Sequence, residues 1–137
     1  SSVPVNYADV SDGDWYRNLY ALDKLYNITH VSDGGFVNPN LPATRADMVV
    51  WEARLYGLTS FDYDITNVCN DIRNSDPWAY AFAIMTDWIV EFPTGFTTPM
   101  ITGYPDGSCK PQGYTNRAEA ITYVLRAYTG LGQISSR

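Results

Sequence analysis

The stretches that decide the fold are NPNLPATRAD at residues 38–47 and KPQGYTNRAE at residues 110–119, because they are two versions of one sequence. An offset of 72 residues aligns further pairs along the chain, namely Gly35 with Gly107, Pro39 with Pro111, Arg45 with Arg117, Asp47 with Glu119, Arg54 with Arg126 and Tyr56 with Tyr128. An internal repeat of this length predicts two copies of one supersecondary unit that bury their apolar faces against each other.

The bulk composition indicates one globular domain. A chain of 137 residues has about the length of a single domain, so we expect the two copies to share a core. With 9 basic and 15 acidic residues the net charge is -6, which argues against a nucleic-acid partner. No stretch reaches the ~20 apolar residues that a membrane span needs. The chain begins with Ser1 instead of Met, as a processed secreted protein does.

The first helix of each copy is predicted by apolar residues at helical spacing. In the two copies these residues are Trp15, Leu19, Leu22 and Tyr26, and Trp78, Phe82, Met85 and Ile89. In the second copy, Asp76-Pro77 has the pattern of an N-cap followed by proline at the first helical position. We expect both apolar stripes, including Trp15 and Trp78, to lie in the core.

The second helix of each copy is predicted by a capping-box pattern, at residues 44–47 and 116–119. These helices should end near Gly57 and Gly130. In the later helix the residues predicted to face inward are Ile121, Val124, Leu125 and Tyr128.

The sequence therefore predicts a mainly α fold of two helix–loop–helix repeats that share one core, with short extended segments and loops. The predicted boundaries are 1–58 for repeat 1, 59–70 for a linker, 71–131 for repeat 2 with an inserted loop at 92–101, and 132–137 for a C-terminal tail. The insertion has no counterpart in repeat 1, and its proline, glycine and threonine content predicts an ordered surface loop.

The two cysteines, Cys69 and Cys109, lack the CxxC spacing of zinc sites and thioredoxin motifs. An even pair in a chain of this composition predicts one disulfide, with two buried thiols as the alternative.

The order of motifs in both copies resembles the S-layer homology family, whose repeat has an aromatic-x-Asp-Val start, a tryptophan opening a helix, a Gly-Tyr-x-Asp-Gly turn and a Thr-Arg-Ala-Glu motif opening a second helix. Repeat 2 contributes Asp71-Ile72, Trp78, Gly103-Tyr104-Pro105-Asp106-Gly107, Lys110-Pro111 and Asn116-Arg117-Ala118-Glu119. Repeat 1 contributes Tyr7-Ala8-Asp9-Val10, Trp15, Gly35-Phe36, Asn38-Pro39 and Thr44-Arg45-Ala46-Asp47.

This resemblance implies a noncatalytic module, without a cofactor, that anchors an extracellular bacterial protein to cell-wall polysaccharide, often a pyruvylated one. It implies that Arg45 and Arg117 bind the ligand's carboxylate, with Tyr104, Trp15 and Trp78 as neighbouring candidates. Family modules commonly carry three repeats around a pseudo-threefold axis. This chain has two repeats, and repeat 1 lacks the Gly-Tyr-Pro of the turn.

Each of the two arginines has a structural alternative. Both follow a helix N-cap directly, where a guanidinium can bind a carboxylate in a bidentate manner and the helix amides favour anions. The alternative is an ion pair with the capping acid or with a neighbouring helix.

Enzymatic and metal-binding functions have little support in the sequence. The single histidine, His30, has no Ser-Gly elbow, and the cysteines have no activating motif. A glycosidase pair of carboxylates is the remaining enzymatic alternative, since spatial pairing is invisible in a sequence. The acidic runs at residues 9–14 and 62–64 lack EF-hand spacing, so no metal site is expected.

Two noncatalytic functions follow from these patterns. The first is the polysaccharide-binding anchor, and the second is a self-assembling subunit of an extracellular lattice or filament. The missing third repeat leaves an apolar flank, which association with another copy or another chain of the family would cover. The alternative cover is the inserted loop, through Phe92, Phe96, Met100 and Ile101.

Overall fold

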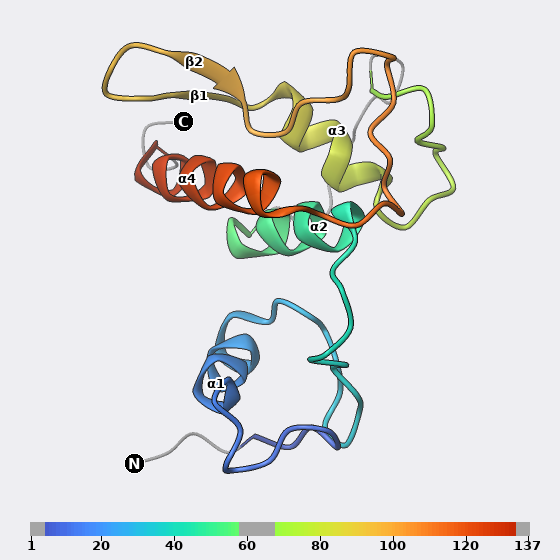
Figure 1. The fold of residues 1–137 in the computed structure, drawn as a ribbon, viewed down its shortest axis with the longest axis vertical. Coiled ribbons are helices and arrows are strands. Elements are labelled where there is room, and N and C mark those ends of the chain that lie inside the picture. Colours follow the sequence, from blue (N-terminus) through green and yellow to red (C-terminus); the bar gives the residue numbers. More distant parts are fainter. Residues whose placement is uncertain (1–4, 58–67, 134–137) are drawn as a thin grey trace. The chain divides into compact units, whose positions relative to one another are not determined.

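The computed structural model describes residues 5–57 and 68–133 and divides into two compact units, Ser1–Pro42 and Ala43–Arg137. The described residues form four helices and one two-stranded sheet, which confirms a mainly α fold. These elements are α1 (Arg17–Tyr26), α2 (Arg45–Leu55), α3 (Ala79–Asp87), β1 (Ile89–Glu91), β2 (Thr97–Pro99) and α4 (Arg117–Gln133) (Figure 1). The arrangement as S-layer homology repeats stays a prediction.

The N-terminal unit is held by a buried carboxylate. Asp23, on α1, accepts a hydrogen bond from the hydroxyl of Tyr7 and two more, both at 2.8 Å, from the backbone amide and hydroxyl of Thr29. The Nζ of Lys24 lies 4.7 Å from the centre of the Tyr7 ring. These bonds satisfy the buried charge, as the burial of a carboxylate requires.

The predicted apolar stripe of the first helix is not a core face. Trp15 lies before α1 and is 88% exposed, and the three later stripe residues are exposed as well. The side of α1 that is buried carries Ala21 and Asp23. The prediction of a buried stripe was therefore wrong, because the carboxylate contacts of Asp23, not the larger side chains, decide which side faces inward.

The same hydrogen bonds between an aspartate side chain and two backbone amides occur in both copies of the repeat. The carboxylate of Asp9 accepts from the amides of residues 37–38 at 3.0 and 2.7 Å. The carboxylate of Asp71 accepts from the amides of residues 109–110 at 2.8 and 2.9 Å. In both loops the second of these residues has a positive φ, 53° at Asn38 and 49° at Lys110. The aspartate of the repeat motif therefore fixes the same left-handed turn twice.

The two copies differ by an insertion of ten residues. Asp71 follows Asp9 by 62 residues, whereas Lys110 follows Asn38 by 72. The predicted surface loop at residues 92–101 accounts for the difference, but much of it belongs to a hairpin in which β1 and β2 pair antiparallel. Its inner end is buried, with Met100 0% and Ile101 1% exposed, while Phe96 is exposed. The prediction of a surface loop was wrong for this inner end, whereas the burial of Met100 and Ile101 agrees with the alternative in which the inserted segment covers apolar side chains of its own chain.

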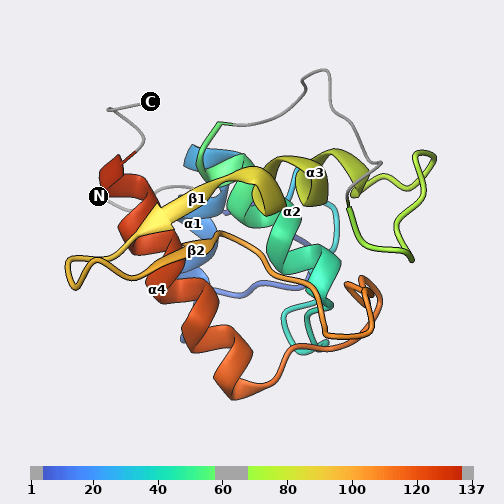
Figure 2. The same ribbon diagram turned by 90° about the horizontal axis from the view of Figure 1, so that it is seen from above.

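The hydrophobic core of the C-terminal unit combines both copies. Its α2 comes from repeat 1, and α3, the hairpin and α4 come from repeat 2; α2 contacts α3, and the hairpin contacts α3 and α4 (Figure 2). The fully buried side chains here include Val49, Phe82, Met85 and Val90. The unit boundary at Pro42–Ala43 falls inside the predicted repeat 1, so the first helix of that repeat belongs to the N-terminal unit and its second helix to this one. Most of the predicted linker and tail lies outside the described residues.

The inward face of α4 also differs from the prediction. Tyr123 is buried and Ala127 packs against the core, whereas the residues predicted to face inward are all exposed, namely Ile121, Val124, Leu125 and Tyr128. Apolar residues lie on more than one side of this helix, so their spacing alone did not identify the packed face. The hydroxyl of Tyr56, the C-cap residue of α2, donates to the carbonyl of Ala127 on α4 at 2.8 Å, which fixes the rotation of α4.

The sequence pattern placed the N-cap of α3 two residues too early, at Asp76, and extended the helix two residues too far, to Ile89. The N-cap is Trp78, and the carboxylate of Asp76 accepts from the amide of Arg73 at 2.8 Å in the preceding turn. Ile89 lies in β1 and is exposed. Trp78 is half-buried and packs against the core, as expected.

Cys69 and Cys109 form a disulfide with a Cα–Cα distance of 5.4 Å, which confirms the predicted pair. Next to it, a Cβ on Gly103 would lie 3.1 Å from the sulfur of Cys69 and 3.0 Å from the carbonyl oxygen of Ser108. The disulfide and this glycine together hold the turn at residues 103–107 close to the start of repeat 2.

Replacing both cysteines, Cys69→Ala with Cys109→Ala, should lower the free energy of unfolding. The bridge joins residues 40 apart, and closing a loop of that length stabilises a fold by about 4 kcal/mol. Urea unfolding of both proteins measures the difference. Alkylation and intact mass of native wild type test the bond, and two modified thiols without reductant would contradict it.

Candidate functional site

The site is built around the turn that carries Tyr104. The amide of Gly107 donates to the carbonyl of Tyr104 at 2.9 Å, and the amide of Tyr104 donates to the carbonyl of Ser108 at 2.8 Å. Gly107 has φ +85°, a backbone conformation that side-chain-bearing residues rarely adopt. The Gly-Tyr-Pro-Asp-Gly sequence therefore determines where the tyrosine ring stands.

The N-terminus of α2 is bound to the loop that follows this turn. The amide of Arg45 donates to the carbonyl of Gly113, and that of Ala46 to the carbonyl of Pro111, both at 2.8 Å. Thr44 forms a β-bridge with Tyr114. Amides in the first turn of a helix have no partner within the helix, and here the loop of repeat 2 supplies carbonyl partners for two of them. The docking fixes Arg45 at the edge of repeat 2.

The guanidinium of Arg45 is buried and bonded on all three nitrogens. Its Nε donates to Oε2 of Glu119 at 2.7 Å, one terminal nitrogen donates to the same oxygen, and the other donates to the carbonyl of Lys110 at 3.0 Å. The Tyr104 ring centre lies 4.8 Å from the guanidinium carbon, and the Tyr104 hydroxyl donates to Glu119 at 3.1 Å. Charge-assisted bonds of this kind are among the stronger ones in proteins.

Only one of the two hydrogen bonds of the capping box predicted at residues 116–119 forms. Asn116 caps α4 by accepting from the amide of Glu119 at 2.9 Å, but the Glu119 carboxylate is bonded to Arg45. In repeat 1 both bonds of the box form between Thr44 and Asp47, as predicted.

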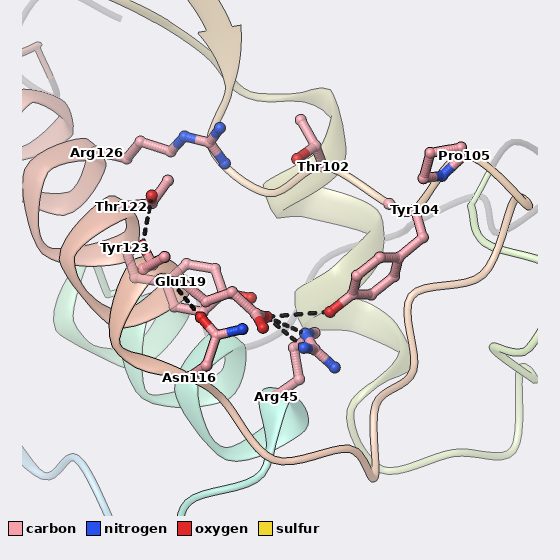
Figure 3. A pocket seen from close by; sticks show the side chains of 11 residues that line it. Arg45, Thr102, Tyr104, Pro105, Asn116, Glu119, Thr122, Tyr123 and Arg126 are labelled. Carbon is pink, nitrogen blue, oxygen red and sulfur yellow. Dashed lines mark hydrogen bonds and ion pairs between the residues drawn. The ribbon is translucent and has the colours of Figure 1, made fainter.

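A pocket of about 440 Å³ opens beside this ion pair. Figure 3 shows Arg45, Glu119 and Tyr104 together on one side and Arg126 on another, with α4 forming one wall. Its lining consists of Arg45, Thr102, Gly103, Tyr104, Pro105, Asn116, Ala118, Glu119, Thr122, Tyr123 and Arg126. Its volume is in the range of sites that bind small ligands, about 300–1,000 Å³.

Arg126, another residue of the pocket lining, interacts electrostatically with a buried glutamate, Glu52. Arg126, half-buried on α4, donates to the carbonyl of Met100 at 3.3 Å, and burial lowers the pKa of its guanidinium. Glu52, on α2, is 6% exposed, and its Oε2 is buried without a hydrogen-bond partner in the described part of the chain. Burial raises the pKa of Glu52 to about 8, although the charge of Arg126 acts in the opposite direction. Glu52 is therefore mostly protonated at neutral pH.

The pocket brings together two of the five predicted ligand residues, Arg45 and Tyr104. Arg117 is exposed and is not among the lining residues, Trp78 packs against the core, and Trp15 belongs to the N-terminal unit. Whether these residues bind a ligand stays a prediction. Sequence reasoning missed Arg126 as a site residue, although its match with Arg54 in the repeat alignment singled it out.

No group of three or more metal-binding side chains gathers among residues 5–57 and 68–133. The acidic run at 62–64 lies outside the described residues, so the expected absence of a metal site stays a prediction. None of the helices in the described part of the chain is both long and apolar enough to cross a membrane.

Comparisons with protein-family models, curated proteins and solved structures found no match to this chain. The resemblance to the S-layer homology family therefore rests on the sequence motifs alone.

Glu52 should make stability depend on pH. Its pKa is about 8 in the folded protein and 4.5 ordinarily, so the folded state binds more protons between these values and wild type loses stability as pH rises through this range. Glu52→Gln cannot ionise, so above about pH 8 it should be more stable than wild type, by a few kcal/mol, with little gain near pH 5. Urea unfolding across this range measures the difference. The exposed Asp87→Asn is the matched control, and parallel pH profiles for wild type and Glu52→Gln would contradict the prediction.

Proposed function

We propose that this chain is a noncatalytic module that binds an acidic cell-wall polysaccharide in the pocket between the Tyr104 turn and α4, and thereby holds a surface protein on the bacterial envelope. The observation that carries the proposal is the composition of the pocket. It combines two arginines, two tyrosine rings and the hydroxyl and amide groups of Thr102, Asn116 and Thr122. Rings with polar groups at their edges suit sugars, and guanidinium groups suit carboxylates.

Two further observations support an extracellular location. The Cys69–Cys109 disulfide is typical of proteins from oxidising compartments. The sequence motifs of the S-layer homology family occur in both halves of the chain, and the Asp9 and Asp71 bonds repeat in the backbone. The anchoring role, the polysaccharide partner and the noncatalytic character are parts of the proposal.

Cosedimentation with purified bacterial cell wall tests the proposal. Tyr104→Ala removes a pocket wall and a contact of Arg45, so we expect the dissociation constant for wall polysaccharide to rise about tenfold. Tyr114→Ala is the matched control, because its side chain is exposed and is not part of the pocket lining. The same incubations should release no reducing sugar. Equal binding by both variants, or absence of wild-type binding, would refute the pocket as a polysaccharide site.

A second candidate function is self-assembly into a lattice or filament, with copies of this chain or another chain of the family. The observation that favours it is the pair of exposed apolar faces. On α1 and just before it these are Trp15, Leu19, Leu22 and Tyr26, and on α4 they are Ile121, Val124, Leu125 and Tyr128. Apolar surface costs about 25 cal/mol per Å² when it stays in water, so covering several hundred Å² would favour association by several kcal/mol.

Light scattering over a wide concentration range tests assembly. If the α4 face mediates it, the mean mass of wild type should rise with concentration, and Val124→Lys should shift that rise to at least about tenfold higher concentration. Ile89→Lys is the control, because Ile89 is also exposed but lies in the hairpin. A wild type that stays monomeric throughout would rule out self-assembly.

A further inference from the structure

The cation that could bind an acidic sugar in this pocket needs N–H groups that are still available. Arg45 offers little, because its Nε and both terminal nitrogens already donate to Glu119 and to the carbonyl of Lys110. The negative charge of Glu119 also compensates that of Arg45. A second carboxylate at Arg45 would have to displace Glu119, and this partly buried carboxylate would then lose its charged partner, which is costly.

Arg126, in contrast to Arg45, still has N–H groups available for a ligand. It lines the pocket and donates from one terminal nitrogen to the carbonyl of Met100 at 3.3 Å, which uses one of the five N–H groups of a guanidinium. No carboxylate among residues 5–57 and 68–133 forms an ion pair with it. In Figure 3 its guanidinium lies across the pocket from the Arg45–Glu119 pair.

We propose that Arg126, rather than Arg45, binds the carboxylate of an acidic sugar in this pocket, and that the buried Glu52 leaves the charge of Arg126 available to it. The inference deepens the proposed function and rests on it. A guanidinium can hold a carboxylate through two parallel N–H···O bonds, which lysine cannot reproduce.

Glu52 controls how much of this positive charge is available. With its pKa raised to about 8, it is mostly neutral at pH 7 and does not compensate Arg126. The other titratable groups that interact with Glu52 or Arg126 are Tyr56, at the C-cap of α2, and Tyr123 on α4. Burial raises the pKa of both tyrosines, that of Tyr123 to about 12, so neither changes charge near neutral pH. As pH rises through about 8, Glu52 ionises, pairs electrostatically with Arg126 and competes with the ligand carboxylate.

Calorimetric titration with two forms of one probe tests the assignment. The probe is purified acidic wall polysaccharide, used as isolated and after its carboxyl groups are reduced to alcohols. At pH 7 wild type should bind the acidic form about 10-fold to 100-fold more tightly than the reduced form. Arg126→Gln should lose that preference while its affinity for the reduced form changes little. Arg126→Lys keeps the charge and should restore part of the preference.

Two controls separate this role from structural damage. Arg117→Gln removes the same charge from an exposed position outside the pocket lining and should keep wild-type selectivity. Glu52→Gln should keep selectivity constant from about pH 7 to pH 9.5, whereas wild type should lose most of it over this range, about tenfold. Melting curves establish that each variant is folded.

The outcomes distinguish this inference from the proposed function. Binding of both polysaccharide forms with equal affinity, or unchanged selectivity of folded Arg126→Gln, would overturn the role of Arg126 while polysaccharide binding stands. The role of Arg126 would also be overturned if Arg117→Gln lost the preference for the acidic form while Arg126→Gln kept it. Absence of wild-type binding to either form would overturn the proposed function and this inference together.

Discussion

The C-terminal unit depends on the docking of the first turn of α2 into the loop of repeat 2. Two backbone bonds, from Arg45 to Gly113 and from Ala46 to Pro111, join segments that are more than 60 residues apart in sequence. The docking also buries the Arg45 side chain, whose ion pair with Glu119 joins α2 to α4. Removing Glu119 would leave the buried guanidinium of Arg45 without its charged partner, which destabilises a fold. The core and the pocket wall are thus both positioned by one helix end.

Asp47 and Glu119 occupy the same place in the repeat but have different partners. The shorter Asp47 carboxylate closes its own capping box by accepting from the amide of Thr44 at 3.0 Å. The Glu119 side chain is one methylene longer, and its carboxylate instead contacts Arg45 and the hydroxyl of Tyr104. Glu119 therefore does not complete the capping box at the start of α4 and instead forms a long-range contact with α2. The Glu119 carboxylate thus joins Arg45 and Tyr104 along one wall of the pocket.

Features governed by local chemistry could be predicted from the sequence. These include the repeat, the Thr44–Asp47 capping box, the disulfide, and the presence of Arg45 and Tyr104 at one site. The sides of α1 and α4 that pack against the rest of their units could not be predicted from the sequence. The spacing of Leu19 and Leu22 predicts a helix face correctly but not its burial, which Asp23 decides through its bonds with Tyr7 and Thr29. Likewise, nothing in the sequence around Glu52 indicates that a glutamate between apolar neighbours would be buried beside Arg126.

The environment of an arginine, not its motif, determines its role in this chain. Arg45 and Arg117 share the motif. Arg45 is buried and bonded to Glu119 and to the carbonyl of Lys110, whereas Arg117 is exposed. A Cβ at position 113 would lie 2.9 Å from a terminal nitrogen of Arg45 and 3.3 Å from the carbonyl oxygen of Lys110, so a larger residue there would displace the end of the Arg45 side chain. Repeat 1 has Leu41 at the matching position, so its loop would need to rearrange to accept an arginine in the same way. The glycine two residues after Pro111 therefore leaves room for the guanidinium of Arg45 beside the loop of repeat 2.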